Sequence, residues 1–304
     1  MSSPATPSLS AEPVQAGGVP EAGRRRRLPS KRMRVFAKNR AAMVGLFILA
    51  VFVFVAIFAP LLTSSDPTLQ NLSSAFEAPS AHHWLGTDDL GRDILARIMY
   101  GGRYTLTIGV IAVGIAMCIG VPFGLISGYL GGAADMIIQR ITDILLSFNA
   151  FLLALVLVAV FGVGLRSVTI AAGIGVLPQF IRLARGQALS IREEVYVEAA
   201  VAFGEKPATI LRRHILRNAL TPIIVYATLN VGLTILVAAG LGFLGVGAQP
   251  PTPEWGSMLG EARSYIFHAS YEMTFPGLAI FLAVLSFNLV GDGLRDAFDP
   301  SLRE

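Results

Sequence analysis

The sequence predicts an all-α polytopic membrane protein with six transmembrane helices. Hydrophobic residues make up 54% of the 304 residues and charged residues only 14%, whereas a soluble chain carries about 25% charged residues. Long uncharged stretches recur along the chain, and none shows the alternation of a membrane β-barrel. Because lipid offers no partners for free backbone amides, we expect each stretch to be a helix.

The six expected spans all approach the roughly 20 apolar residues that cross about 30 Å of hydrocarbon. They are 41–62, 105–130, 141–162, 167–183, 219–245 and 274–291. The first stretch resembles a signal peptide in position, but it is long and lacks a small-x-small cleavage site near Pro60. We therefore expect it to be an uncleaved anchor.

The chain before the first span has two parts. Residues 1–23 are rich in Ala, Pro, Ser and Gly, and nine Lys and Arg residues follow between Arg24 and Arg40. A basic run can indicate nucleic acid, but this run abuts an apolar stretch, which favours a membrane surface and no nucleic acid. We expect 1–40 to be a disordered, basic cytoplasmic tail.

The positions of Lys and Arg predict the orientation. With the N-terminus inside, 19 of the 24 basic residues fall on inner segments, and five fall on outer ones. This asymmetry predicts a multi-pass protein of the cell membrane with both termini in the cytoplasm. The expected layout is an extracytoplasmic segment 63–104 with a surface helix, a core 105–292 of five helices with an inner loop 184–218, and a cytoplasmic tail 293–304.

Two sequence features that many transporters use are missing from this chain. No ionisable residue lies near the middle of an expected span, which weakens a stand-alone proton-coupled transporter. No Gly-Lys pair occurs, so there is no phosphate-binding loop of the G-x-x-x-x-G-K-S/T type. We expect no enzyme active site, no bound cofactor and no metal in this chain, and any ATP would be used elsewhere. A membrane scaffold that recruits cytoplasmic partners is a third interpretation of the chain's function, beside a transporter driven by ATP and a proton-coupled one.

The inner loop has the pattern of two short helices. The residues before Gly204 favour helix, Gly204 suits a left-handed C-terminal position, and Pro207 suits the first turn of another helix. Ala199 and Ala200 form a small surface that permits close approach, and Glu198 can pair with a partner's charge. The loop is either a docking knob in the cytoplasm or an amphipathic loop on the membrane.

At these residues the chain resembles a known family. Glu198-Ala199-Ala200, followed after three residues by Gly204, is similar to the signature loop of permeases of ATP-binding cassette (ABC) importers. In that family the loop is a coupling helix seated in a groove of the ATP-binding subunit. The family pattern places a proline where this chain has Arg217, which leaves the end of the second loop helix open.

Three further segments narrow the resemblance to the C-type permease of dipeptide and oligopeptide importers. They are His83 to Asp93, Gly240 to Leu259 and Asn288 to Asp296. The resemblance covers about 33–303 and implies the type I ABC importer permease fold with alternating access. It also implies a second homologous permease subunit, two ATP-binding subunits that use ATP and Mg, and an extracytoplasmic substrate-binding protein. The cargo is expected to be a dipeptide or oligopeptide, with glutathione or nickel as alternatives.

The outer segments contain candidate contacts for the binding protein. These are Asp88, Asp89, Arg92, Glu254 and Trp255. The alternative is local loop packing, with Thr87 or Asp88 capping a surface helix over Leu90–Met99. A metal site built from the neighbouring histidines and aspartates lacks a strong ligand spacing.

Three polar residues are expected near membrane depth. Asn149, Gln179 and Asn230 need partners there, so they line the substrate path or join helices by hydrogen bonds. Pro122 and Pro178 can kink their spans and open such a path.

Overall fold

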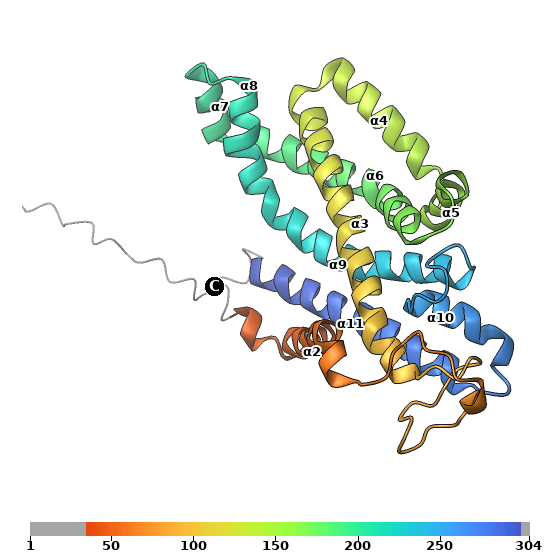
Figure 1. Cartoon of the computed structure of the whole chain (residues 1–304). Helices are drawn as coiled ribbons and strands as arrows, with labels where there is room; N and C mark the ends of the chain where they lie inside the picture. The colour runs from red at the N-terminus through yellow and green to blue at the C-terminus, as the bar shows by residue number, and fades with distance from the viewer. Residues whose placement is uncertain (1–34, 299–304) are drawn as a thin grey trace, which may run out of the picture.

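The structure is a computed structural model that describes residues 35–298. The expected N-terminal tail up to residue 34 and the last six residues lie outside this range. Within it, the chain is a bundle of helices without a strand (Figure 1). The helices are α2 (Arg40–Leu62), α3 (Ile94–Leu130), α4 (Gly132–Leu146), α5 (Ala150–Phe161), α6 (Leu165–Arg192), α7 (Val195–Ala202), α8 (Pro207–Ile210), α9 (Leu216–Phe243), α10 (Trp255–Ala262) and α11 (Tyr271–Phe298).

Between residues 35 and 298, five continuous helices are long and apolar enough to cross a membrane, and a bent pair could form a sixth span. The expected span 141–162 is not one helix, because α4 and α5 meet at an angle of 92°. The break follows from capping: the Asn149 side chain accepts a hydrogen bond from the Phe151 amide at 2.9 Å and starts α5. Ser147 turns its hydroxyl back onto the Ile144 carbonyl at the end of α4.

Other helix boundaries also differ from the expectation. Helix α3 begins at Ile94 and is capped by Asp93, whose side chain accepts from the Ala96 amide at 2.8 Å. The expected surface helix is therefore not separate, since residues 94–99 form the first turns of the 37-residue helix α3. Helix α11 continues to Phe298, through the first residues of the expected C-terminal tail.

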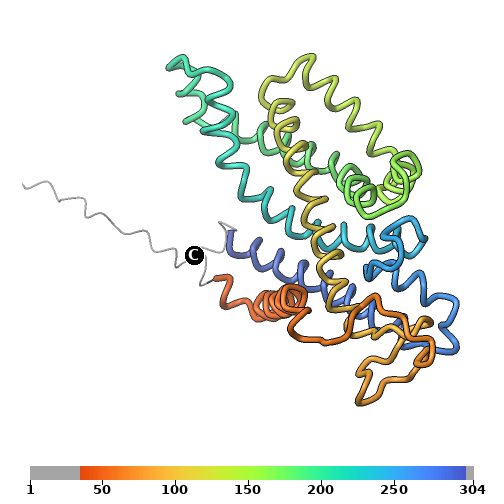
Figure 2. The backbone as a smooth tube through the Cα atoms, in the orientation of Figure 1, coloured from red at the N-terminus to blue at the C-terminus, as the bar shows by residue number. Residues whose placement is uncertain are grey.

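The centre of the bundle is the close packing of α3 against α6, which lie side by side in Figures 1 and 2. Three glycines four residues apart on α3 face α6: Gly120, Gly124 and Gly128. A Cβ added at Gly120 would lie 2.8 Å from the Cβ of Phe180, and one at Gly128 would lie 2.6 Å from the Arg185 carbonyl oxygen. Only glycine permits this approach, so the seam holds the two helices as one unit.

Helix α2 packs on the edge of the bundle against α11 and α3. Pro60 has no amide hydrogen, so it cannot donate to the carbonyl of Ala56. Arg103 of α3 supplies the donor with its Nε, and its Nη2 donates to the Ile57 carbonyl at 2.9 Å. The proline inside α2 thereby creates a fixed contact with α3.

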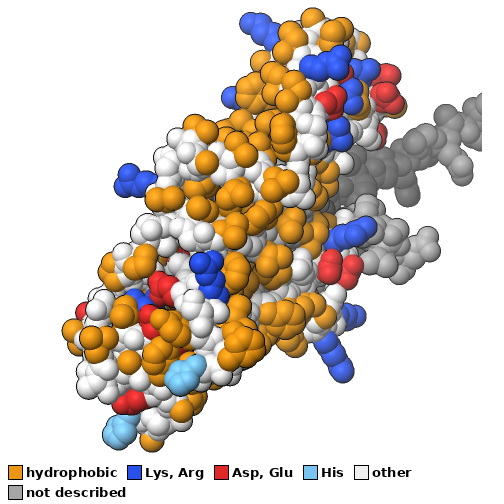
Figure 3. All heavy atoms as spheres, turned by 90° about the vertical axis from the view of Figure 1, so that its right-hand side faces the viewer, with side chains coloured by type: hydrophobic (Ala, Val, Ile, Leu, Met, Phe, Trp, Pro, Cys, Tyr) orange, Lys and Arg blue, Asp and Glu red, His pale blue; other side chains and the backbone are white. Residues whose placement is uncertain are grey.

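The loops gather at opposite ends of the bundle. In Figure 1 the segment 63–93 and α10 lie at the lower right, and α7 and α8 lie at the upper left. The two described chain ends are close together, because Asn39 donates to the Asp296 carboxylate at 2.9 Å. Figure 3 shows hydrophobic side chains over much of the flank between these ends. The arrangement suits a bundle whose flank faces lipid.

Candidate functional site

The inner loop is a helix, a tight turn and a second helix, as the sequence predicts. Helix α7 ends in a Schellman motif: the Glu205 amide donates to the Ala200 carbonyl at 3.1 Å, and the Gly204 amide donates to the Val201 carbonyl at 2.9 Å. Gly204 has a φ of 79°, which is the left-handed conformation that this motif requires. The segment between the end of α6 and the start of α8 is only 193–206 and contains α7, so it is shorter than the expected loop 184–218.

The second loop helix runs directly into the bundle. Pro207 is the first residue of α8, and a π-helical turn over Leu211–Ile215 connects α8 to α9. Arg217 is the second residue of α9, so the helix continues where the family pattern has proline. His214 contacts the Glu205 carboxylate at 3.1 Å and ties the turn to the second helix.

The surface of this loop is more apolar than the signature residues suggest. Glu198 and Ala199 are exposed, whereas Ala200 is buried and packs α7 onto the bundle. Large side chains surround them at the tip, including Phe203 with 88% of its surface exposed, together with Val195, Tyr196 and Val201. We define the tip surface as Val195, Tyr196, Glu198, Ala199, Val201 and Phe203. An exposed apolar patch of this kind marks a contact with a protein or with the membrane.

The three predicted path residues do not form one group. Gln179 on α6 accepts a hydrogen bond from the Tyr226 hydroxyl at 2.9 Å, and the buried Asn230 donates to the Tyr226 carbonyl at 2.8 Å. These two therefore meet around Tyr226 between α6 and α9. Asn149 is exposed at the α4–α5 bend, where it caps α5.

Two ion pairs join α4 to α6, and sequence reasoning missed both. Arg182 donates to Asp143 at 2.8 Å, and each side chain is more than half exposed. Arg185 binds the Asp135 carboxylate with two hydrogen bonds of 2.7 Å. The sequence placed Asp143 and Arg182 at the edges of expected spans, and only the antiparallel packing of α4 on α6 brings them together. An exposed ion pair on spanning helices is expected to face water or protein rather than lipid.

The outer charges form a buried cluster within the chain. Arg92 Nε donates to Asp88 at 2.6 Å, and Glu261 of α10 accepts from Arg92 at 2.9 Å and from Arg97 at 3.0 Å. The side chains of Arg92 and Arg97 are only 2% and 1% exposed. Burial is the main cause that raises the pKa of the half-buried Asp89 carboxyl, and the charge of Asp88 adds to it. The cluster fastens segment 63–93 to α10.

The outer segment that leads into α10 is also held by buried hydrogen bonds within the chain. The Glu254 carboxylate accepts from the amides of Gly256 and Ser257, both at 2.9 Å, and so caps α10. Trp255 is fully buried, and its Nε1 donates to the Ile98 carbonyl at 2.9 Å. Burial raises the pKa of Glu254, against the lowering effect of the hydrogen bonds that it accepts.

These positions correct the docking expectation for four of its five residues. Asp88, Arg92, Glu254 and Trp255 are buried, so they pack the chain itself and do not present a surface to a partner. Asp89 alone keeps partial exposure. Exposed large side chains at this end include Trp84 and Phe267, at 72% and 102%, together with Leu69 and Leu72.

Comparison with known proteins gives the family of the chain. Residues 120–304 match the family described as the inner membrane component of binding-protein-dependent transport systems. This chain belongs to that family. Residues 30–79 match a second description, the N-terminal transmembrane domain of oligopeptide transport permease C. The protein is therefore a permease subunit of an ABC importer, a transport protein rather than a catalytic one.

Curated relatives are similar to this chain over most of their length. The dipeptide transport system permease protein DppC of Alkalihalophilus pseudofirmus is 52% identical over 266 residues, which is 88% of each chain. The glutathione transport system permease protein GsiD of Pectobacterium atrosepticum is 45% identical over 89% of this chain and 90% of its own. A probable D,D-dipeptide permease of Escherichia coli is 44% identical over 83% and 85% of the two chains.

A solved structure supports the fold. A chain of the MetNI methionine ABC transporter in an inward-facing conformation is similar with a TM-score of 0.57 and 20% identity. The match covers 68% of this permease and 98% of that chain. At this level of identity the likeness extends to the fold alone, and it confirms the expected type I importer architecture.

Proposed function

We propose that this permease forms part of the membrane path of an importer for dipeptides or oligopeptides, powered by ATP hydrolysis in separate subunits. The chain has no phosphate-binding loop of its own, so the ATP and Mg belong to two partner ATP-binding subunits. A second homologous permease completes the path, and an extracytoplasmic binding protein delivers the cargo. Both termini and α7–α8 then face the cytoplasm, as the distribution of Lys and Arg favours.

The observation that carries the proposal is the shape of α7–α8. The Schellman turn at Gly204 and the contact between His214 and Glu205 make the tip a fixed protrusion rather than a loose loop. The tip surface places Phe203, Val201 and Glu198 outward, on the side of an adjacent groove of about 560 Å³. A rigid apolar tip with one carboxylate fits insertion into a groove of an ATP-binding subunit. Glu198, Ala199, Ala200 and Gly204 therefore act as coupling residues, with Ala200 supporting α7 from within.

For the path itself, we propose Gln179 as a lining residue together with the Arg182–Asp143 pair, while the buried Asn230, bonded to the Tyr226 carbonyl of its own helix, supports α9 from within. The exposure of that pair suits a water-filled passage between this permease and its partner. A peptide carries both an ammonium and a carboxylate group. Asp143 can bind the ammonium group, and Arg182 can bind the carboxylate, as the peptide passes. Asn149 at the α4–α5 bend lies on the edge of this region.

At the other end, the binding protein is proposed to contact Trp84 and Phe267 rather than the buried cluster. Both are large apolar side chains exposed on segments that the cluster and the Glu254 cap hold in place. Apolar anchors on a rigid support are the usual centre of a protein contact.

Peptide cargo rests on the names of the relatives. One relative, 52% identical, is a dipeptide permease, and another is named for glutathione, itself a peptide. The binding protein is expected to make the final choice of cargo, and nickel stays an alternative outcome of the uptake assay.

The test is reconstitution of the permease with its neighbouring subunits into vesicles, followed by uptake of labelled dipeptide, a longer peptide, glutathione and nickel. Uptake of a peptide that requires both ATP and the binding protein supports the proposal. Uptake by this chain alone under a pH gradient would instead make it a self-sufficient carrier. If the chain assembles with partner proteins but no ATP-dependent uptake follows, it would instead be a scaffold.

A further inference from the structure

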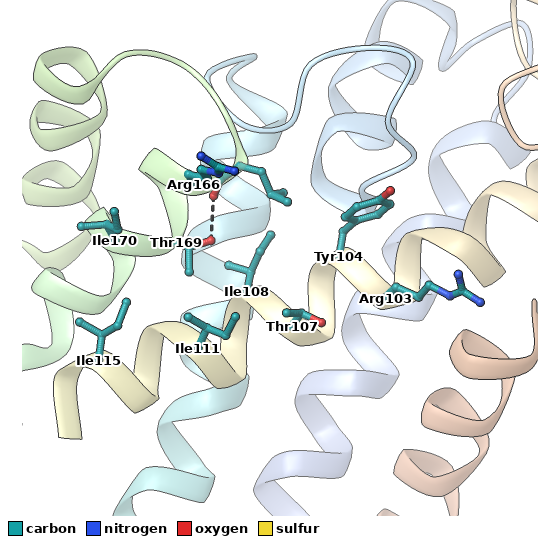
Figure 4. A pocket seen from close by; sticks show the side chains of 10 residues that line it. Arg103, Tyr104, Thr107, Ile108, Ile111, Ile115, Arg166, Thr169 and Ile170 are labelled. Carbon is teal, nitrogen blue, oxygen red and sulfur yellow. Dashed lines mark hydrogen bonds between the residues drawn. The ribbon is translucent and has the colours of Figure 1, made fainter. Parts of the chain in front are cut away.

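A cavity of about 490 Å³ lies between the first half of α3 and the start of α6 (Figure 4). This volume falls within the range of about 300–1,000 Å³ that is usual for small-ligand sites. Arg103 and Tyr104 line it from α3, and Arg166 lines it from the first turn of α6. The rest of the wall is mainly isoleucine, including Ile108 and Ile111.

The polar and apolar groups are ordered along the helix axis. Arg103 and Tyr104 come first on α3, and the isoleucines follow in the next turns, the last of them Ile115. At 1.5 Å per residue, Ile115 lies roughly 18 Å further along the helix than Arg103. In Figure 4, Arg103 and Tyr104 lie at one end of the α3 wall and Ile115 at the other, whereas Arg166 lies beside Thr169 and the isoleucines. A membrane lipid carries a charged headgroup next to an acyl chain, and Arg166 beside the isoleucines offers a surface to each.

The charge of the site is unbalanced. Within residues 35–298, no carboxylate pairs with Arg166, which is exposed, and no carboxylate lines the cavity. Arg103 is fixed by the α2 carbonyls and lies 5.3 Å from the Tyr100 ring centre, so its charge has no anionic partner there either. Nε and Nη2 of Arg103 are already used on α2, and Figure 4 shows this side chain pointing away from Arg166. Arg166 is therefore the guanidinium that can bind a phosphate-bearing ligand through several hydrogen bonds.

The apolar wall argues against the cargo as occupant. The hydroxyl of Thr169 already donates to the Leu165 carbonyl at 2.7 Å, and isoleucine offers no hydrogen bonds. A peptide backbone lying along this wall would lose its partners, which is costly, whereas an acyl chain has none to lose. Ile111 and Ile170 are 48% and 43% exposed, so the cavity opens to the outside of this chain.

We propose that this cavity is a binding site for an anionic phospholipid. The phosphate headgroup binds Arg166 beside Tyr104, and one acyl chain lies along Ile108 and Ile111. Basic pockets between membrane helices recognise anionic headgroups in this manner. The site is separate from the coupling tip and from the Arg182–Asp143 pair, so its failure would leave the proposed transport function untouched.

The test uses the assembled importer in nanodiscs that contain either a photoactivatable phosphatidylglycerol or the matching phosphatidylcholine, with labelled peptides identified by mass spectrometry. We expect phosphatidylglycerol to label 103–115 and 165–170 in preference to phosphatidylcholine. Arg166→Gln should lower that preference about fivefold, since one interfacial arginine is removed. Ile111→Trp should lower labelling by both lipids because it fills the cavity.

Arg263→Gln is the matched control, because Arg263 is exposed at the same end of the bundle and does not line the cavity. It should leave labelling unchanged. Retained subunit assembly and ATPase activity show that each variant is folded. Equal labelling by the two lipids in the parent protein, or an equal loss in Arg166→Gln and Arg263→Gln, would overturn the proposal. Labelling of the same segments by a photoactivatable dipeptide in place of the lipid would also overturn it.

Discussion

Replacing Gly204 tests the coupling role of the α7–α8 turn with a cost that the structure defines. The φ of 79° lies in the left-handed region, where a residue with a Cβ costs about 1–2 kcal/mol. Nothing lies within 4 Å of a Cβ added there, so Gly204→Ala adds no steric cost. The equilibrium constant for the formed turn should therefore fall about 5- to 30-fold. Gly204→Pro should cost at least about 3 kcal/mol, because it also removes the amide that donates to Val201.

The assay is ATP-dependent uptake by the reconstituted importer, measured beside ATP hydrolysis in the same vesicles. We expect Gly204→Ala to lower uptake per ATP hydrolysed, and Gly204→Pro to abolish coupled uptake while the permease still reaches the membrane. The matched control is Gly162→Ala, since Gly162 has a φ of 89° and equally open surroundings at the end of α5.

Two results would refute this reasoning. Normal coupled uptake in Gly204→Pro would show that the turn transmits nothing. An equal loss in Gly204→Ala and Gly162→Ala would show that the effect is general destabilisation rather than lost coupling.

Three further predictions concern charged groups. Glu261→Ala should lower the free energy of unfolding by about 3 kcal/mol, because it leaves two buried guanidinium groups poorly paired; a Tm within error of the parent would contradict this. Burial raises the pKa of Glu254, so its carboxyl group keeps its proton to higher pH in the folded state than in the unfolded state. The free energy of unfolding should therefore fall as the pH rises above the ordinary carboxyl range, and this pH dependence should be weaker in Glu254→Gln. Arg182→Gln should reduce uptake but leave binding of the ATP-binding subunits intact, and the exchange of Arg182 and Asp143 should restore assembly but not uptake; full uptake in the exchanged pair would make it purely structural.

The sequence was informative where a feature depends on neighbouring residues. Apolar stretches of sufficient length predicted five of the spans, and Gly204 with Pro207 predicted the turn and the start of α8. These features depend on local hydropathy and backbone conformation, which the residues themselves determine.

The break between α4 and α5 was also local, yet it was missed. Both sides of Asn149 are apolar, so the hydropathy pattern runs across the break as if the helix were continuous. Asparagine followed by an apolar run is a helix-start signal, and this signal was outweighed by the hydropathy.

The outer charges could not be interpreted from sequence because their partners are distant. Arg92 and Glu261 are 169 residues apart, and Thr105 and Glu254 are 149 apart. A charged loop residue is exposed by default, and only tertiary packing reveals that Arg92 is buried. Docking was therefore predicted for residues that are buried and hold the loops together.

The glycine seam on α3 has a mechanical consequence. Since α3 is 37 residues long, it extends about 55 Å, with the cluster of Arg92 and Arg97 at its start and Gly128 near its end. Helix α6, locked to it, leads directly into α7. A tilt of about 5° in this double rod would carry its far end through roughly 5 Å over such a length. A displacement at the proposed coupling tip would thus reach the opposite end of the permease through the tilt of this double rod, without any chain of side-chain rearrangements between them.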